Sequence, residues 1–256
     1  MRVVVCALAK NEHLYINEWV KHYIDLGFSH IYLYDNDNPN SPYIGNFIDK
    51  TYADKITIYN IRGVKQKYLQ HHVYNNFYHT HSFDWCLFCD IDEFLVGISN
   101  VIDFLNDYRL KNYAQIRIKW RLFGDDNKIS RDVSKPVHGF FKNEIKDLAL
   151  CNQSKCFIRG NLPCIDIHSC HYIKGLKSCY PSGKECQSNK IELIDYDDEC
   201  VFMYHYMTKT LDEFIKQKLK RGDAVWENRS IDFSYFWRIN EKTEEKLEYI
   251  KNMWLA

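Results

Sequence analysis

The sequence has no excess of charge of either sign, because 34 basic residues balance 34 acidic ones. A neutral chain does not attract the phosphate backbone of nucleic acids over its whole surface, so we expect no nucleic-acid partner, although a local basic cleft can still hold phosphate. Hydrophobic residues make up 46% of the 256 positions and charged residues 27%. This composition excludes global disorder and predicts a packed core.

Long apolar runs are also missing. No stretch approaches the roughly 18 apolar residues that cross a bilayer. The apolar run from Val3 to Leu8 is shorter than a signal-peptide core, and no small-residue cleavage site follows it. We therefore expect a cytoplasmic protein without a transmembrane segment. Peripheral membrane association, through a partner or a lipid-linked acceptor, stays open.

Cysteine is present without a recognisable pattern. Cys86 and Cys89 form a C-x-x-C pair inside an apolar, strand-like run, which favours buried thiols over zinc or redox chemistry. Seven further cysteines fall between 151 and 200, at spacings that match no zinc motif. A chain of this length without an export signal is not expected to be a disulfide scaffold. A structural metal or local disulfides in that segment stay open.

Strand-like and helix-like patterns alternate through the first 125 residues, and no repeat or low-complexity tract interrupts them. The alternation predicts the α/β class, with a mostly parallel central sheet and helices on both faces. Ile116 and Ile118 alternate with Arg117 and Lys119, which predicts a half-buried strand. The expected strands are 2–8, 30–34, 55–59, 85–89 and 116–120, and the expected helices run from Asn11 to Gly27, over 66–82 and onward from Asn100.

Regular alternation fades beyond residue 125. Short strand-like pieces such as 156–158 stand between turns rich in Gly, Pro, Asn and Ser, which predicts an irregular elaboration that could carry an acceptor site. Order returns with a strand at 201–206, a helix that begins with the capping box of Thr210 and Glu213, and a last helix over 241–255. We expect one domain over 1–256, with a nucleotide-sugar-binding half (1–125), an acceptor- and metal-side half (126–208) and C-terminal helices (209–256).

Two carboxylates, Asp90 and Asp92, follow the strand 85–89. In an extended chain residues i and i+2 point to the same face, so both side chains leave the strand end together. Ligands of open α/β sheets bind outside the carboxyl ends of the strands. Carboxylate oxygens there suit Mg²⁺ or Mn²⁺, which would also bind the diphosphate of a nucleotide and offset the charge of its departure. We therefore predict both aspartates as metal ligands, with Asp90 also near the nucleotide-sugar.

The block Asp90-Ile91-Asp92-Glu93-Phe94 is one of a series that keeps its order over roughly residues 3–224. In this series the chain resembles family-2-like glycosyltransferases of the GT-A fold, and the related family that includes animal β-galactosyltransferases, which carry an Asp-x-Asp-Glu-Phe block. The other blocks are Ala9-Lys10-Asn11-Glu12, Glu18-Trp19, Leu26-Gly27-Phe28, Tyr34-Asp35-Asn36, Gln70, Tyr74-Asn75, Trp120-Arg121-Leu122-Phe123-Gly124, Lys155, His205-Tyr206 with Lys209-Thr210, Glu213-Phe214, Lys218 and Arg221-Gly222.

The resemblance implies a metal-dependent, inverting glycosyltransferase. Its donor would be a nucleotide-sugar, in particular a UDP-hexose such as UDP-galactose or UDP-glucose, and its acceptor a hydroxyl of a glycan or glycolipid. Each implied donor contact has a structural alternative, namely a helix cap with surface charges, an Asx turn or a polar helix position. The resemblance places Ala9, Lys10, Asn11 and Glu12 where the first strand meets the nucleotide, Asp35 at the nucleoside, and Gln70 and Lys155 toward the donor.

Two carboxylates leave coordination positions of a cation open, so we expect a further ligand. His168 matches a position that commonly carries His in the family that the chain resembles. His205 is the rival, and Lys209, four residues later, can neutralise a diphosphate as a point charge. We predict both histidines as candidate metal ligands, with a purely structural histidine as the alternative for each.

The catalytic base is the remaining assignment. An inverting transferase needs a carboxylate or histidine near the acceptor hydroxyl and forms no covalent intermediate. Glu93, next to the acid pair, and Asp125, on the loop expected after Gly124, are the candidates. Glu93 is equally compatible with supporting a metal ligand from behind.

Two other classes of function remain compatible with the sequence. One is another metal-dependent enzyme of phosphate chemistry, a nucleotidyltransferase or phosphohydrolase, although the haloacid-dehalogenase type does not continue its acid pair with Glu93-Phe94. The other is a non-catalytic carbohydrate-binding module of the same fold. The nucleotide that is released from a nucleotide-sugar distinguishes these classes.

Overall fold

The structure is a computed structural model that describes residues 1–146, 151, 153–163, 165–168, 172–186, 200–221 and 231–255. Its strands form one curled sheet in the order β3-β2-β1-β4-β8-β6-β10-β5, and β7 and β9 both pair with β6. The strands are β1 (Val3–Ala9), β2 (His30–Asp35), β3 (Ile56–Asn60), β4 (Trp85–Phe88), β5 (Glu93–Val96), β6 (Gln115–Phe123), β7 (Glu144–Ile145), β8 (Ser154–Arg159), β9 (Ser178–Cys179) and β10 (Phe202–His205).

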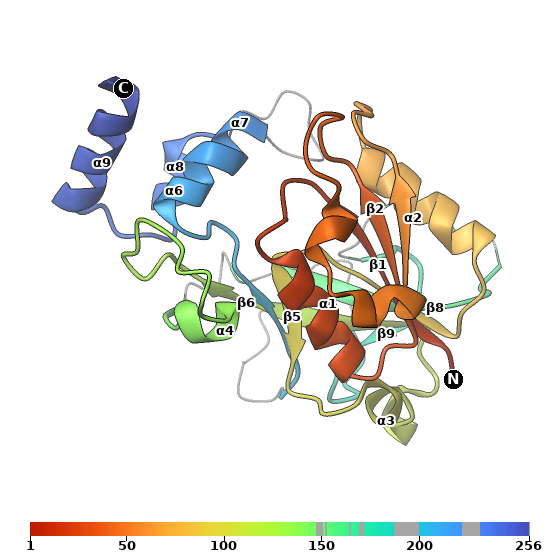
Figure 1. Ribbon diagram of the computed structural model, residues 1–256. Helices are drawn as coiled ribbons and strands as arrows, with labels where there is room; N and C mark the ends of the chain where they lie inside the picture. Colours follow the sequence, from red (N-terminus) through yellow and green to blue (C-terminus); the bar gives the residue numbers. More distant parts are fainter. Residues whose placement is uncertain are drawn as a thin grey trace.

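Helices cover both faces of the sheet, as Figure 1 shows for α1 and α2. The helices are α1 (Ile16–Asp25), α2 (Leu69–Thr80), α3 (Val101–Leu105), α4 (Val137–Phe140), α6 (Leu211–Glu213), α7 (Leu219–Arg221), α8 (Phe233–Trp237) and α9 (Glu244–Leu255), with 3₁₀ turns η1 (Ile44–Phe47), η2 (Lys50–Lys55) and η3 (Tyr108–Leu110) and a π-helical turn η5 (Phe214–Lys218). Among the described residues, no helix has both the length and the apolar character needed to cross a membrane.

Strand β1 separates two hydrophobic layers. Val3 and Val5 belong to the cluster that α1 contributes to, whereas Val4 and Cys6 belong to the cluster of α2. Successive side chains of a strand point to opposite faces, so an all-apolar strand between two helical layers is buried on both sides. The predicted α/β class, consistent with a GT-A-like fold, is confirmed.

The sheet has a parallel half and a mixed half. β3, β2, β1 and β4 run parallel, as the sequence pattern predicts. β8 comes from the irregular part of the chain, inserts between β4 and β6, and is antiparallel to both. β10 is parallel to β6 and antiparallel to β5. β6, β9 and β10 therefore run in the same direction as β4, whereas β5, β7 and β8 run the opposite way, and the prediction of a mostly parallel sheet is confirmed.

Strand β6 is buried on both faces, so the prediction of a half-buried strand is wrong. Arg117 is 1% exposed and Lys119 is 3% exposed, although both are basic. β6 lies in the interior of the sheet, between β8 and β10. The guanidinium of Arg117 lies 4.9 Å from the ring centre of Tyr172, which gives the buried cation an aromatic face.

Helix α1 begins later than predicted. Asn11 has a left-handed backbone (φ 59°) instead of capping the helix, and its N–H donates to a carboxylate oxygen of Asp37 at 2.5 Å. Gly27 ends the helix as predicted, with φ 87°, and a Cβ at this position would lie 2.7 Å from the side-chain nitrogen of Asn100. Residues 10–15 therefore form a loop at the carboxyl edge of the sheet between the end of β1 and the start of α1 at Ile16.

The C-terminal elements form a separate cluster, in which α6 and η5 pack on α8 through Leu211, Phe214 and Phe236. The predicted capping box is present, because Thr210 accepts from the backbone of Glu213 and the Glu213 carboxylate accepts in return. In Figure 1 this cluster and α9 lie at one end of the molecule.

The described cysteines are free thiols, and Cys86 and Cys89 are buried as predicted. Of the Cys-rich segment, Cys164 and Cys170 lie outside the described residues. The described members of that segment are Cys151, Cys156, Cys179, Cys186 and Cys200, and none forms a disulfide with another described cysteine.

Candidate active site

The acid block connects the end of β4 to the start of β5 and is held by its backbone. The indole N–H of Trp19, from α1, donates to the carbonyl oxygens of Asp90 and Glu93 at 3.1 Å each. The N–H of Tyr206, after β10, donates to the carbonyl oxygen of Asp92 at 3.0 Å. Elements from both ends of the chain therefore fix the position of the two aspartates.

Asp90 faces polar partners from α2 and β8. The side-chain amide of Gln70 donates to one carboxylate oxygen at 2.7 Å, and the Lys155 ammonium donates to the other at 2.7 Å. Burial raises the pKa of Asp90, but the charge and hydrogen bond of Lys155, together with the charge of His205, leave the pKa below its usual value. Gln70 and Lys155, both predicted near the donor, thus meet at Asp90.

Asp92 is more deeply buried and faces cations from the C-terminal part of the chain. Its Oδ2 lies 3.4 Å from Nζ of Lys218, and its Oδ1 lies 3.6 Å from Nε2 of His205. Burial raises the pKa of Asp92, but Lys218 and then His205 hold it well below the usual range. Asp92 is therefore an anion at neutral pH.

Glu93 lies beneath both aspartates and is fully buried. Its Oε2 accepts from the N–H of Asp90 at 2.9 Å and lies 3.4 Å from Nζ of Lys155. Its Oε1 faces Nδ1 of His205 at 3.8 Å. Burial raises the pKa of Glu93 to about 7, against the lowering effect of Lys155. The geometry suits a residue that orients its neighbours, since the carboxylate has no exposed surface to offer an acceptor.

His205, at the end of β10, faces two carboxylates of the acid block. It ends β10 in register with Glu93 on β5, and its ring packs 4.4 Å from the ring of Trp120 on β6. One ring nitrogen faces Asp92 and the other faces Glu93. A histidine with a carboxylate behind one nitrogen has the arrangement in which metal-binding imidazoles are commonly held.

Two of the predicted nucleotide contacts after the first strand, Glu12 and Ala9, have side chains that are already paired or buried. Glu12 forms an ion pair with the Lys209 ammonium, which also lies 4.2 Å from the ring centre of Tyr15. The side chain of Ala9 is fully buried, so only its backbone can contact a ligand, and its carbonyl oxygen accepts from the N–H of Asn36. Lys209 has a left-handed backbone (φ 58°), which turns the chain from β10 into the capping box.

The predicted nucleoside contact, Asp35, is fully buried at the end of β2. One of its carboxylate oxygens accepts from the N–H of Asp37 at 3.0 Å, and the other lies 3.6 Å from Nε of Arg62. Lys10 and Asn11, next along the chain from β1, line a hollow at the same edge of the sheet. The ends of β1 and β2 therefore form one polar edge.

Two predicted residues lie apart from this cluster. His168 is exposed, and its Nδ1 lies 3.0 Å from the backbone oxygen of Asp166. Asp125 is buried and pairs with Lys246 of α9 at 2.6 Å. Burial raises the pKa of Asp125 although Lys246 opposes the shift. Within the described part of the chain, no hydrogen bond or ion pair joins either residue to Asp90 or Asp92.

Lys218 is the site residue that was not predicted as such, although it appears among the ordered blocks. Helical periodicity alone places it as a polar residue on a C-terminal helix. The structure turns its ammonium inward, to Asp92 and to the carbonyl oxygen of Met207. Its position in η5, a π-helical turn, is not visible in the sequence pattern.

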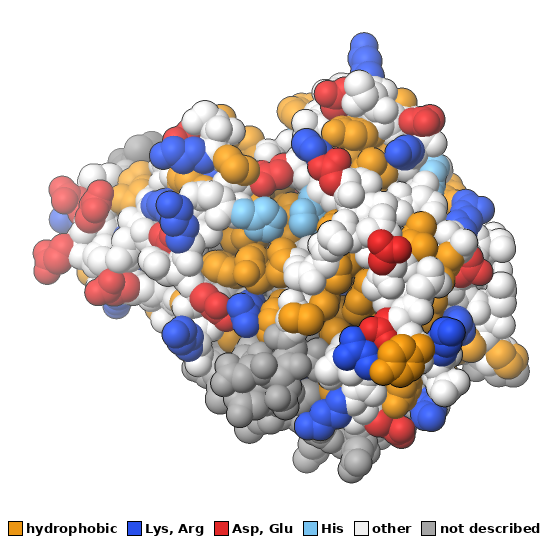
Figure 2. Space-filling model, turned by 90° about the horizontal axis from the view of Figure 1, so that it is seen from below, with side chains coloured by type: hydrophobic (Ala, Val, Ile, Leu, Met, Phe, Trp, Pro, Cys, Tyr) orange, Lys and Arg blue, Asp and Glu red, His pale blue; other side chains and the backbone are white. Residues whose placement is uncertain are grey.

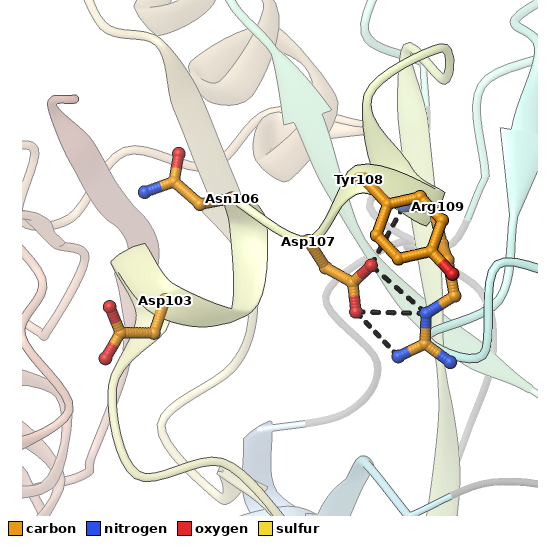
Figure 3. A pocket seen from close by; sticks show the side chains of 5 residues that line it. All are labelled: Asp103, Asn106, Asp107, Tyr108 and Arg109. Carbon is orange, nitrogen blue, oxygen red and sulfur yellow. Dashed lines mark hydrogen bonds and ion pairs between the residues drawn. The ribbon is translucent and has the colours of Figure 1, made fainter.

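Other surface features are less suited to a site. The hollow of Figure 3, lined by the segment from Asp103 to Arg109, lies at the opposite edge of the sheet, beside α3 (Figure 1). The guanidinium of Arg109, the basic group of this hollow, is already paired with Asp107, and its Nη2 lies 2.6 Å from Oδ2 of that carboxylate. The face seen from below in Figure 2 mixes acidic and basic side chains around a hydrophobic centre.

The sheet is flanked by helices, and the acid block at the carboxyl end of β4 is opposed by His205 and two lysines, an arrangement consistent with a GT-A-like fold. Residues 2–248 match the model of glycosyltransferase family 92. The chain belongs to this family. The predicted membership of a glycosyltransferase family is confirmed, whereas the likeness to family-2-like enzymes, the transfer activity and the metal role of the acid pair stay predictions.

Solved structures of low overall similarity were also found. TarS (1-349) of S. aureus in complex with UDP-GlcNAc has a TM-score of 0.36 and 15% identity, over 52% of this chain and 37% of that chain. The same protein in complex with UDP has a TM-score of 0.37 and 13% identity, over 52% and 38%. HddC of Yersinia pseudotuberculosis has a TM-score of 0.35 and 11% identity, over 62% and 77%. This chain thus spans little more than a third of the TarS structures. Among curated proteins, no match was found.

Proposed function

We propose that this chain transfers a hexose from a UDP-linked donor to a hydroxyl of a glycan or glycolipid, with Mn²⁺ or Mg²⁺ bound at Asp92. Membership of a glycosyltransferase family supports sugar transfer. The choice of UDP-galactose or UDP-glucose rests on the resemblance of the sequence blocks. The observation that carries the proposal is the buried anion of Asp92 facing His205 and Lys218 at a strand end, where α/β sheets bind ligands.

Asp92 and His205 are the two side chains that would hold a divalent cation. Two ligands about 2.1 Å from one cation lie about 3 Å apart in neighbouring positions of an octahedron and about 4 Å apart in opposite positions. Oδ1 of Asp92 and Nε2 of His205 lie 3.6 Å apart, between these two values, so one side chain would have to shift slightly to bind the cation together with the other. Among the described residues, no group of three or more His, Cys, Asp or Glu side chains lies close enough together to hold a metal ion. The donor's phosphate oxygens and water would complete the coordination, and Asp90 would join through water.

The lysines of the site suit a phosphate-bearing donor. When bound, the cation would act as a Lewis acid on the diphosphate. Lys218 lies against Asp92 and Lys155 lies against Asp90. With a donor bound there, the two ammonium groups would face the negative charge that develops on the leaving nucleoside diphosphate. Fixed charges of this kind stabilise a transition state because they do not have to reorient during the reaction.

An inverting reaction by single displacement also needs a base at the acceptor hydroxyl. Glu93 and Asp125 were the candidates, and both carboxylates are buried in ion-pair networks. We assign Glu93 to positioning, because its oxygens face Asp90, Lys155 and His205. Asp125 stays a candidate base that would first have to leave Lys246.

The proposal is tested by incubating the protein with a panel of UDP-sugars and Mn²⁺, with and without candidate acceptors. We expect release of UDP, and its loss in EDTA. Release of UMP instead would identify nucleotidyl or hydrolase chemistry. Binding of sugars without turnover of any donor would identify a carbohydrate-binding module.

A further inference from the structure

A hollow of about 690 Å³ lies at the carboxyl edge of the sheet, outside the cluster around Asp92. One wall consists of loops that follow β1, β2 and β3, and the other consists of η5 and α7. Figure 1 shows α7 beside the loops that follow the strands at this edge. The volume is in the range of small-molecule sites, about 300–1,000 Å³.

The charge of this hollow is one-sided. Four lysines line it, Lys10 and Lys65 from the sheet loops and Lys216 and Lys220 from the helical wall, and no described lining residue is a carboxylate. Two described acids of neighbouring loops and helices are already paired. Asp37 accepts from the N–H of Asn11, and Asp212 binds Lys216 at 2.8 Å.

Two of the four lysines have no acidic partner among the described residues. Within the described part of the chain, neither Lys65 nor Lys220 has an ion-pair partner, and both are exposed at the hollow. Lys216 and Lys220 are four residues apart, so their side chains share one face of the helical wall. Like charges at this spacing repel each other, and a bound anion relieves the repulsion.

The helical wall joins the hollow to the proposed metal site. Lys218 lies between Lys216 and Lys220 in the chain but points to Asp92 instead. One stretch of helix therefore presents cations in two directions. The negative charge of a diphosphate at Asp92 is offset there by Lys218, Lys155 and the proposed cation. The nucleoside part of a donor carries no charge. Neither the diphosphate nor the nucleoside therefore accounts for the lysines of the hollow.

We infer that the hollow binds a phosphate group in addition to the diphosphate proposed at Asp92. The phosphate belongs to a separate phosphate-bearing molecule, such as an acceptor, because a UDP-linked donor has no phosphate beyond the diphosphate at Asp92. The inference rests on the proposed function only in placing that diphosphate at Asp92. Ammonium groups on two walls bind phosphate as point charges, so binding depends strongly on salt.

The test uses the double variant Lys65→Gln/Lys220→Gln and the charge-retaining control Lys65→Arg/Lys220→Arg. Calorimetry measures two dissociation constants at low salt, that of UDP and that of inorganic pyrophosphate with UDP already saturating. Two surface charges contribute about 1 kcal/mol together, so we expect the Gln variant to bind pyrophosphate roughly fivefold more weakly than wild type. The Arg variant should bind pyrophosphate like wild type. Circular dichroism checks that both variants fold.

The two arms separate this phosphate from those of the donor. Weaker pyrophosphate binding alone in the Gln variant supports the inference, whereas weaker UDP binding would place the donor's own diphosphate in the hollow and overturn it. Equal dissociation constants for wild type and both variants with both probes would also overturn the inference. If the wild type releases UDP from no sugar donor, the proposed function fails, whereas the pyrophosphate arm still decides whether the hollow binds phosphate.

Discussion

At the scale of single residues, the candidate site is organised by opposite charges that come from distant parts of the chain. Asp90 and Asp92 follow β4, whereas their cations, Lys155 and Lys218, come from β8 and η5. Each aspartate is held below its ordinary pKa by its lysine, although burial acts in the opposite direction. The acids are therefore ionised and able to bind a cation at neutral pH.

Substitution of Asp92 is the sharpest test at this scale. Asp92→Asn removes the anion that faces both His205 and Lys218. We expect kcat for UDP release to fall about 100-fold or more, since loss of one fixed electrostatic group has effects of that order, and we expect the stabilisation by Mn²⁺ to disappear in thermal unfolding. The control is Asp103→Asn on α3, which should retain wild-type turnover. Wild-type activity of Asp92→Asn would exclude a metal role for this residue.

The second prediction at this scale concerns Glu93. Glu93→Gln keeps the shape of the side chain but removes the charge behind His205 and Lys155. Loss of a carboxylate that orients a metal-binding histidine typically weakens metal binding 10–100-fold. We expect the Kd for Mn²⁺, measured by calorimetry, to rise by about this factor, and activity to recover in part at high Mn²⁺. A general base would behave differently, because added Mn²⁺ would not restore kcat.

At the scale of elements, β10 and the helix after it carry the second half of the site. β10 brings His205 into register with Glu93, and the left-handed Lys209 turns the chain into the capping box of Thr210 and Glu213. This cap fixes where η5 begins and thus where Lys218 lies. The sequence motif for the cap was recognisable, but its consequence for the charge at Asp92 was not.

Removal of the cap should therefore affect both stability and catalysis. Thr210→Ala is expected to lower the free energy of unfolding by about 1 kcal/mol, the usual cost of losing an N-cap, and also to lower kcat. The control is Asn100→Ala, which removes the cap of α3, where Asn100 accepts from Ile102 and Asp103. Urea unfolding should show similar losses for the two variants. A fall in kcat of equal size in both would refute the link between this cap and the site.

At the scale of the whole molecule, the sheet joins a parallel half to a mixed half, and the mixed half supplies the charges that oppose the acid block. β8 inserts beside β4 and carries Lys155, and β10 ends at His205. Trp19 and Tyr206 tie the acid block to both halves. A ligand at this place contacts both halves, so its binding should stabilise the fold as a unit.

Ligand addition tests this coupling. A ligand at 100 times its Kd stabilises the native state by about 2.7 kcal/mol, which corresponds to a rise in Tm of roughly 5–10 °C for a chain of this size. We expect UDP with Mn²⁺ to produce a shift of that order, measured by scanning fluorimetry. EDTA should abolish it. A shift from UDP that persists unchanged in EDTA would show nucleotide binding without the cation.

The sequence by itself determined the elements of the parallel half and the place of the acid block. Apolar strands followed by polar turns specify β1, β2 and β4 through local periodicity, and the Asp-x-Asp pair at a strand end follows from it. The sequence blocks between residues 3 and 224 were enough to predict a glycosyltransferase. Their order along the chain can be compared with that of a family without knowing which residues meet in space.

Tertiary structure alone decided what each charged side chain faces. Periodicity placed Arg117 at a solvent-facing position and left Lys218 as a polar helix residue, yet the sheet buries the first and a π-helical turn directs the second to Asp92. It also separated His168 from the aspartates while bringing in His205. The reason is physical: local patterns encode strands and helices, whereas pairing between charges more than 60 residues apart depends on strand order, which no local pattern specifies.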